Sequence, residues 1–125
     1  MPSAPSALED LSARLLRAMV SAAKADGHIT ERERVRITSQ LQSAGLGPEL
    51  RGLLEAELAR PLDINAVADL ARSEEEAAEI YAASLLVVDP DLPAEKAYLA
   101  LLAARLELDP KLVEHLHANA AAITA

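Results

Sequence analysis

Residues 77–88 read AAEIYAASLLVV, and a helix built from them carries apolar side chains on nearly every side. A helix of this kind is normally the buried centre of a helical bundle. Ser73 and Glu76 form a capping box just before the stretch, a pattern typical of a helix N-terminus. The stretch is far too short to cross a bilayer. It therefore predicts a central helix around which the rest of the chain packs.

Amphipathic segments with helix start signals lie on both sides of this centre. They are expected at about residues 6–25, 30–45, 48–60, 65–71, 93–106 and from 110 onward. Their start signals are the capping boxes Ser6–Glu9 and Thr30–Glu33, the caps Asp63 and Asp109, and the prolines Pro48, Pro93 and Pro110. Runs of alternating β-branched residues are missing from the sequence. The prediction is an all-α fold of about seven helices in a compact bundle.

Composition limits both the core and the chemistry of the chain. A length of 125 residues fits one domain, residues 1–125. Tyr81 and Tyr98 are the only members of the Phe, Trp and Tyr group, so Ala, Leu, Val and Ile must build the core. The absence of Cys excludes disulfides, thiolate metal sites and cysteine nucleophiles.

The two halves of the sequence resemble each other. In each half an apolar helix ends at an acidic residue, Asp26 or Asp89, and an apolar residue follows three positions later. The next helix of each half closes in a similar turn, GLGPEL at 45–50 and ELDPKL at 107–112. The offset between the halves is 63 residues at the first turn and 62 at the second. A structural repeat is therefore predicted, with halves at about residues 6–62 and 63–125.

The net charge of −8 belongs entirely to the second half. Residues 1–62 hold eight basic and eight acidic residues, whereas residues 63–125 hold four basic and twelve acidic ones. Nucleic acid is not an expected partner, because no basic stripe with stacking aromatic residues is present. An acidic surface favours a basic protein partner, whose identity and stoichiometry the sequence leaves open.

The N-terminus has neither a basic flank nor an apolar run over residues 1–8, so it does not read as a secretory signal. A cytoplasmic location is expected, without direct membrane insertion. Membrane association is expected only if the chain is the soluble part of a longer protein.

The two acidic turns are the candidate functional site. Carboxylates at loop–helix junctions are ligands that hard cations such as Ca²⁺ and Mg²⁺ prefer. The candidate metal ligands are Asp26 and Glu33 in the first turn and Asp89 and Asp91 in the second, where Glu95 is a further acid. If a pseudo-two-fold axis relates the halves, the turns either share one ion or bind two. The alternative interpretation is that these acids only finish one helix and cap the next.

The first turn is not an EF-hand. Asp26 and Glu33 match positions 5 and 12 of an EF-hand loop, but Ala22 and Lys24 would occupy positions 1 and 3, which require oxygen ligands.

Sequence patterns typical of an enzyme active site are also weak. His115 and His117 lie two residues apart on a helix and point to different sides, and no serine has a nucleophile context. No catalytic residue is therefore predicted.

Residues 18–29, AMVSAAKADGHI, with Glu31 and Glu33 after them, resemble the TerB-like tellurite-resistance domain. The second half, from AEIYAAS at 78–84 to LDP at 108–110, looks like the TerB-like domain of the YebE-type bacterial inner-membrane family. The resemblance covers nearly the whole chain after the first few residues. It implies an all-α bundle with internal pseudo-symmetry. The metal-binding positions that it implies are Asp26, Glu33, Asp89 and Asp91.

The resemblance is incomplete in one respect, because YebE-type proteins carry an N-terminal region with membrane-spanning potential that has no counterpart in this sequence. Tellurite resistance is not transferred either, since a shared fold does not transfer function. The expected function is a non-enzymatic accessory or interaction module that binds a divalent cation weakly and docks a protein partner, in a stress or envelope response. The alternatives are a purely structural interaction domain without metal and, third, a carboxylate-dependent hydrolase.

Overall fold

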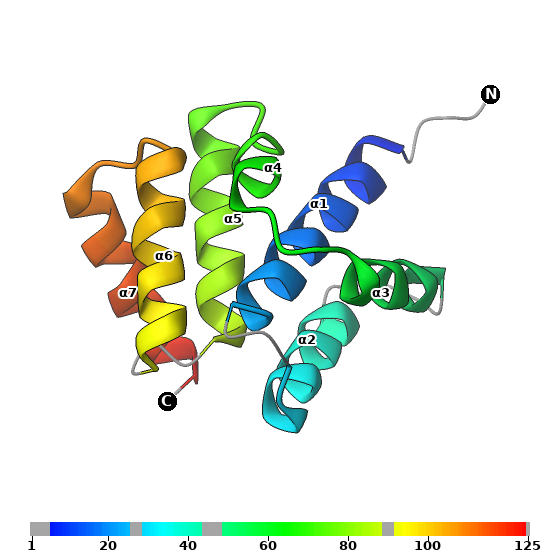
Figure 1. Cartoon of the computed structure of the whole chain (residues 1–125). Coiled ribbons are helices and arrows are strands. Elements are labelled where there is room, and N and C mark those ends of the chain that lie inside the picture. Colours follow the sequence, from blue (N-terminus) through cyan, green and yellow to red (C-terminus); the bar gives the residue numbers. More distant parts are fainter. Residues whose placement is uncertain (1–5, 26–28, 44–48, 89–91, 125) are drawn as a thin grey trace.

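The computed structural model describes residues 6–25, 29–43, 49–88 and 92–124, and within these ranges it contains seven helices and no strand (Figure 1). The helices are α1 (Ser6–Ala23), α2 (Glu31–Ser43), α3 (Glu49–Ala59), α4 (Ile64–Ala68), α5 (Glu74–Val87), α6 (Pro93–Arg105) and α7 (Pro110–Thr124). The predicted all-α class is confirmed. Each predicted helix is present, and the bounds differ by a few residues.

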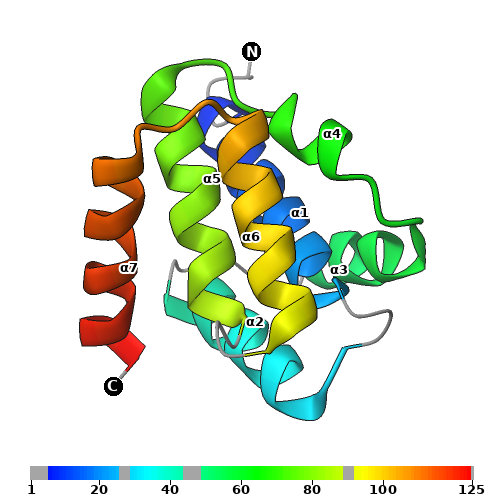
Figure 2. The same cartoon turned by 60° about the vertical axis from the view of Figure 1, so that its left-hand side comes forward.

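Helix α5 lies at the centre of the bundle, as its apolar sequence predicts. Helices α1, α2, α6 and α7 all pack against it. Ile80, Tyr81 and Ser84 on this helix are buried, and the Ser84 hydroxyl donates a hydrogen bond of 2.9 Å to the Ile80 oxygen. Figure 2 shows α7 on the side of α5 that faces away from α1. Helices α7 and α1 therefore cover opposite sides of the central helix.

Helix α1 makes its largest helix–helix contact with α5. The buried face of α1 combines the larger side chains Leu16, Met19 and Val20 with the single methyl groups of Ala18 and Ala22. Such small residues let neighbouring helices approach closely, and interhelical distance depends on the side chains at the contact. Close packing of these small residues thus supplements the two buried tyrosine rings, Tyr81 and Tyr98, in a core without Phe or Trp.

Three predicted helix caps are confirmed by hydrogen bonds. Thr30 Oγ1 accepts from the Glu33 amide at 3.1 Å, and Glu33 Oε1 accepts from the Thr30 amide at 2.9 Å, which completes the capping box. Asp63 Oδ1 accepts from two amides of α4 at 3.1 and 3.2 Å. Asp109 Oδ1 accepts from an amide of α7 at 2.8 Å. The side chains of the predicted Ser6–Glu9 box lie outside the described part of the chain.

Glu76 departs from its predicted capping box. Ser73 Oγ accepts from the Glu76 amide at 3.1 Å, so half of the box forms. The Glu76 carboxylate instead accepts from two Arg14 nitrogens, at 2.6 and 3.4 Å, and from the Arg72 amide at 2.9 Å. Arg14 also donates to the Leu70 oxygen at 2.8 Å. These hydrogen bonds, that of Arg14 above all, lower the pKa of Glu76, and they tie α1 to the start of α5.

The turn from α6 to α7 contains a residue with left-handed backbone geometry. Glu107 has a φ of 56°. The Glu107 amide donates to the Ala104 oxygen and the Leu108 amide donates to the Ala103 oxygen, each at 3.1 Å. This pair of hydrogen bonds is the Schellman motif, which usually has glycine in the left-handed position. Glu107 therefore bears a steric cost that glycine would avoid.

Candidate functional site

Helices α1 and α5 end at the two acidic turns. Of the predicted metal ligands, Asp26, Asp89 and Asp91 lie outside the described residues, and Glu33 lies within them. Arg36 on α2 donates a hydrogen bond of 3.1 Å from Nη1 to the backbone oxygen of Val88. The helix that follows the first turn thus contacts the residue that directly precedes the second turn.

Glu33 is almost completely buried, with 3% of its surface exposed. Its Oε1 atom accepts the Thr30 amide hydrogen bond of the capping box, whereas Oε2 is buried without a hydrogen-bond partner. Buried polar atoms are rarely left unsatisfied, because losing water without gaining a partner costs about 1–3 kcal/mol. Glu33 therefore serves as a cap through one carboxylate oxygen and buries the other without a hydrogen bond.

Glu95 is the counterpart of Glu33 in the second half. Glu33 is the third residue of α2 and Glu95 is the third residue of α6, 62 positions later. Glu95 is buried as well, with 0% of its surface exposed. Both helices that follow the acidic turns thus bury a carboxyl group in their first turn. The 63-residue offset of the first turn would instead pair Glu33 with Lys96, so this equivalence rests on the two helix starts and not on the sequence repeat.

Among the described residues, no cluster of three or more His, Asp or Glu side chains could hold a metal ion. The two histidines of α7 have separate partners, as their spacing predicts. His117 Nε2 lies 2.8 Å from the Tyr81 hydroxyl oxygen, with the two rings 5.7 Å apart, and His115 Nε2 lies 3.3 Å from Asn119 Nδ2. Tyr81 and His117 join α5 to α7.

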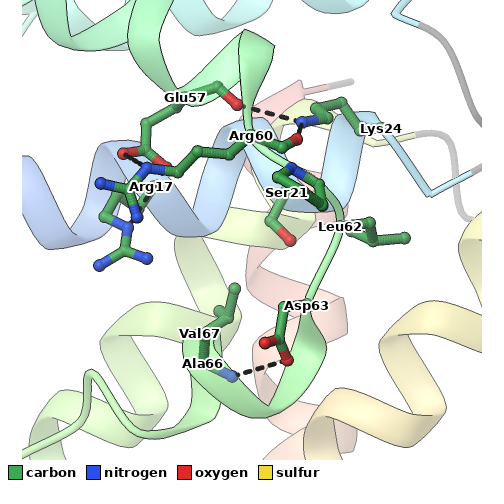
Figure 3. A pocket seen from close by; sticks show the side chains of 10 residues that line it. Arg17, Ser21, Lys24, Glu57, Arg60, Leu62, Asp63, Ala66 and Val67 are labelled. Atoms are coloured by element: carbon green, nitrogen blue, oxygen red, sulfur yellow. Dashed lines mark hydrogen bonds and ion pairs between the residues drawn. The ribbon is translucent and has the colours of Figure 1, made fainter.

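A pocket of about 210 Å³ between α1 and the α3–α4 connection was not predicted from the sequence (Figure 3). Three basic side chains line it, Arg17, Lys24 and Arg60, together with two acidic ones, Glu57 and Asp63. The remaining lining residues are Ser21, Pro61, Leu62, Ala66 and Val67. The sequence does contain a pattern that indicates this polar site, because residues 17, 21 and 24 form a polar row at helical spacing on the otherwise apolar α1.

Glu57 organises the basic side chains of this pocket. Its carboxylate is buried; Oε1 accepts a hydrogen bond from Arg17 Nε and Oε2 forms an ion pair with Arg60 Nε, each at 3.2 Å. Lys24 Nζ donates to the backbone oxygens of Glu57, at 3.1 Å, and of Arg60. These carbonyls belong to the C-terminal end of α3, where a positive charge is favoured by the helix dipole. The pocket wall is therefore fixed by ion pairs and by a helix cap.

Ser21, which lines the pocket, is hydrogen-bonded to a buried tyrosine. The Tyr98 hydroxyl, which belongs to α6, donates a hydrogen bond of 2.8 Å to Ser21 Oγ on α1. Tyr98 is buried, and this burial raises its pKa. It therefore stays protonated as a donor at neutral pH.

Two comparisons with known proteins give matches. A family model described as "Protein of unknown function (DUF533)" matches residues 1–120. A protein of Yersinia enterocolitica described as "Uncharacterized protein in ampR 5'region" is 38% identical over 95 residues, which cover 76% of this chain and 68% of that protein. No solved structure gives a significant match.

In the described part of the chain, no helix has the length and apolar character needed to span a membrane. The family match extends over nearly the entire sequence, and the Yersinia protein matches three quarters of it. This chain belongs to the DUF533 family.

Proposed function

We propose that this chain is a non-enzymatic accessory module that binds a divalent cation, Ca²⁺ or Mg²⁺, at its two acidic turns and docks a protein partner. The proposed ligands are Asp26, Glu33, Asp89 and Asp91. The resemblance of both halves to TerB-like domains supports the proposal, because it implies metal-binding acids at these positions. A role in a stress or envelope response is part of the same proposal.

The observation that carries the cation proposal is the buried Oε2 atom of Glu33, which has no hydrogen-bond partner. A carboxylate that is 3% exposed and leaves one oxygen without a hydrogen bond would gain from a positively charged ligand. The Arg36–Val88 hydrogen bond adds support, since it joins the helix after the first turn to the end of α5. The two acidic turns follow α1 and α5, and together they would supply several carboxylate oxygens. Hard cations prefer such oxygen-rich coordination.

A structural role without metal is the second candidate, and the completed capping box of Thr30 and Glu33 favours it. In that case the acidic residues end one helix and cap the N-terminus of the next, and Glu33 is buried because its cap position faces the core. Glu33→Gln separates the two roles, because glutamine also serves at this position of a capping box but removes the charge.

The experiment is thermal unfolding of chelator-stripped protein, followed by circular dichroism, alone and with Ca²⁺, Mg²⁺, Mn²⁺ or Zn²⁺. A ligand at about one hundred times its dissociation constant stabilises a protein by about 2.7 kcal/mol. For a domain of this size the melting temperature should rise on the order of 10 °C. Under the cation proposal the rise occurs with one preferred ion and is lost in Glu33→Gln and in Asp26→Asn/Asp89→Asn.

Glu114→Gln is the matched control, since Glu114 is exposed on α7 and its substitution removes the same charge. It should keep the full cation response. The structural role predicts instead that no ion shifts the melting temperature and that Glu33→Gln melts at or slightly above the wild-type temperature. Such a result would overturn the cation proposal.

A further inference from the structure

We propose that the pocket between α1 and the α3–α4 connection binds a small organic oxyanion, a carboxylate or a phosphate monoester with a short apolar body. None of the residues that line the pocket is a proposed cation ligand, and all of them lie within the described part of the chain. The inference therefore goes beyond the proposed function and does not depend on it.

The first argument is the arrangement of two guanidinium groups on one carboxylate. Arg17 and Arg60 each use Nε to bind Glu57, and both reach this carboxylate from the same side of the pocket (Figure 3). Within the described residues, no hydrogen bond occupies their Nη groups. The lining holds three basic side chains and two acidic ones, so one positive charge has no acidic counterpart in the pocket. An anionic ligand on the Nη groups would balance this charge, and guanidinium groups bind carboxylate and phosphate in a bidentate manner.

The second argument is the hydroxyl of Ser21, which points into the pocket (Figure 3). Tyr98 donates to Ser21 Oγ at 2.8 Å, so the serine proton is left to donate elsewhere. The buried Ser84 donates its proton to the carbonyl four residues earlier. Among the hydrogen bonds of the described residues, Ser21 makes no equivalent bond to the Arg17 carbonyl. The Ser21 hydroxyl is therefore a donor oriented toward the pocket, which again suits an anion.

The volume of the pocket and its apolar lining limit the uncharged part of the ligand. Leu62 and Val67 are among the lining residues and provide apolar surface. The volume of about 210 Å³ lies below the range of about 300–1,000 Å³ that is typical of drug-sized ligands. A short alkyl chain that carries one anionic group fits both limits, whereas a nucleotide does not.

The test uses four probes with the same four-carbon body: butyrate, butyl phosphate, butanol and butylammonium. Titration into the metal-free chain of residues 1–125 is followed by amide and arginine Nε signals in nitrogen–proton NMR spectra. The expected result is saturable shifts at residues 17, 21, 60 and 66 with butyrate or butyl phosphate. The relative affinities of these two identify carboxylate or phosphate as the preferred group. Butanol and butylammonium should not produce these shifts.

Variants then assign the binding groups. Arg60→Gln should weaken oxyanion binding about 10- to 100-fold, because a hydrogen bond to a charged group contributes about 1.5–3 kcal/mol. Ser21→Ala keeps all the charges and should weaken binding by a smaller factor. Arg32→Gln, on the exposed surface of α2, removes one positive charge elsewhere and should bind like the wild type.

Two outcomes would overturn the inference. One is that neither oxyanion produces saturable shifts in the pocket at millimolar concentrations. The other is that Arg60→Gln and Arg32→Gln weaken binding equally, which would assign the effect to general charge. Because no divalent cation is present in these titrations, either outcome leaves the cation proposal for the acidic turns unaffected.

Discussion

Arg36 on α2 donates its hydrogen bond to the backbone oxygen of Val88, the residue that caps the C-terminal end of α5. The last carbonyls of a helix have no partner within the helix and need one from outside. Val88 is buried, so water is a poor substitute for the guanidinium group. One side chain thus satisfies the end of the central helix and fixes the position of α2 against it.

Arg36→Gln should lower the free energy of unfolding by about 1–3 kcal/mol, the cost of a buried polar group that loses its partner. Urea unfolding followed by circular dichroism measures this difference. Arg32→Gln on the same helix is exposed and should change stability by no more than about 0.5 kcal/mol. Equal effects of the two substitutions would show that the Val88 contact does not stabilise the bundle.

The ion pair of Arg14 and Glu76 should make stability dependent on pH. The hydrogen bond from Arg14 holds the pKa of Glu76 below its ordinary value of 4.5. A carboxyl group whose pKa is lower in the folded state stabilises the fold above its unfolded-state pKa. That contribution is lost as the pH falls through the lower, folded-state pKa.

Comparing the wild type with Glu76→Gln isolates this effect. The difference in free energy of unfolding should be constant above about pH 4.5 and should shrink as the pH falls further. Urea unfolding at a series of pH values measures it. Glu75→Gln, at an exposed neighbouring position, should show little difference from the wild type at any of these pH values. A pH-independent difference for Glu76→Gln would contradict the prediction.

Glu107→Gly should stabilise the protein. The left-handed φ of 56° costs a non-glycine residue about 1 kcal/mol or more, and glycine removes the clash at some cost in chain entropy. The expected gain is about 1 kcal/mol, or a rise in melting temperature of about 3–6 °C. Glu107→Ala keeps the Cβ atom and should not show this gain. If alanine stabilises as much as glycine, the gain comes from lost charge rather than from backbone strain.

Ala22→Leu should destabilise the chain by about 1–3 kcal/mol. Ala22 is fully buried on α1, where three additional carbon atoms would overpack the core. Ala100→Leu on the exposed face of α6 adds the same atoms to a helix and should be nearly neutral. Thermal unfolding of both variants provides the measurement. Tolerance of leucine at position 22 would mean that the core around α1 is looser than its burial indicates.

The sequence predicts the helices and the central position of α5 because both follow from local patterns. Residues 77–88 are apolar on nearly every side, and no surface helix could satisfy that pattern. The caps at Thr30, Asp63 and Asp109 follow from contacts within four residues. Local rules of this kind do not require knowledge of how distant segments meet.

The long-range contacts could not be predicted in the same way. Glu76 has the spacing of a capping box with Ser73, but its carboxylate binds Arg14, which is 62 residues away in the sequence. The contact with Arg14 joins two ionised groups through two hydrogen bonds, whereas the capping box would supply one neutral amide. The pocket combines side chains of α1, α3 and α4, and only the tertiary fold brings these together. For the predicted metal ligands, only the position of Glu33 is described.

The packing of α1 against α5 also determines whether either half of the chain can fold alone after the chain is cut between them. The two predicted halves meet through these helices, so each half would lose its partner if the chain were cut in the exposed segment at residues 60–63. We expect neither peptide to form a closed core alone. Mixed together, the two peptides should assemble by fragment complementation, and a protease that nicks this segment should leave a folded two-chain complex. The repeat, if it arose by duplication, would then have produced one cooperative unit instead of two independent domains.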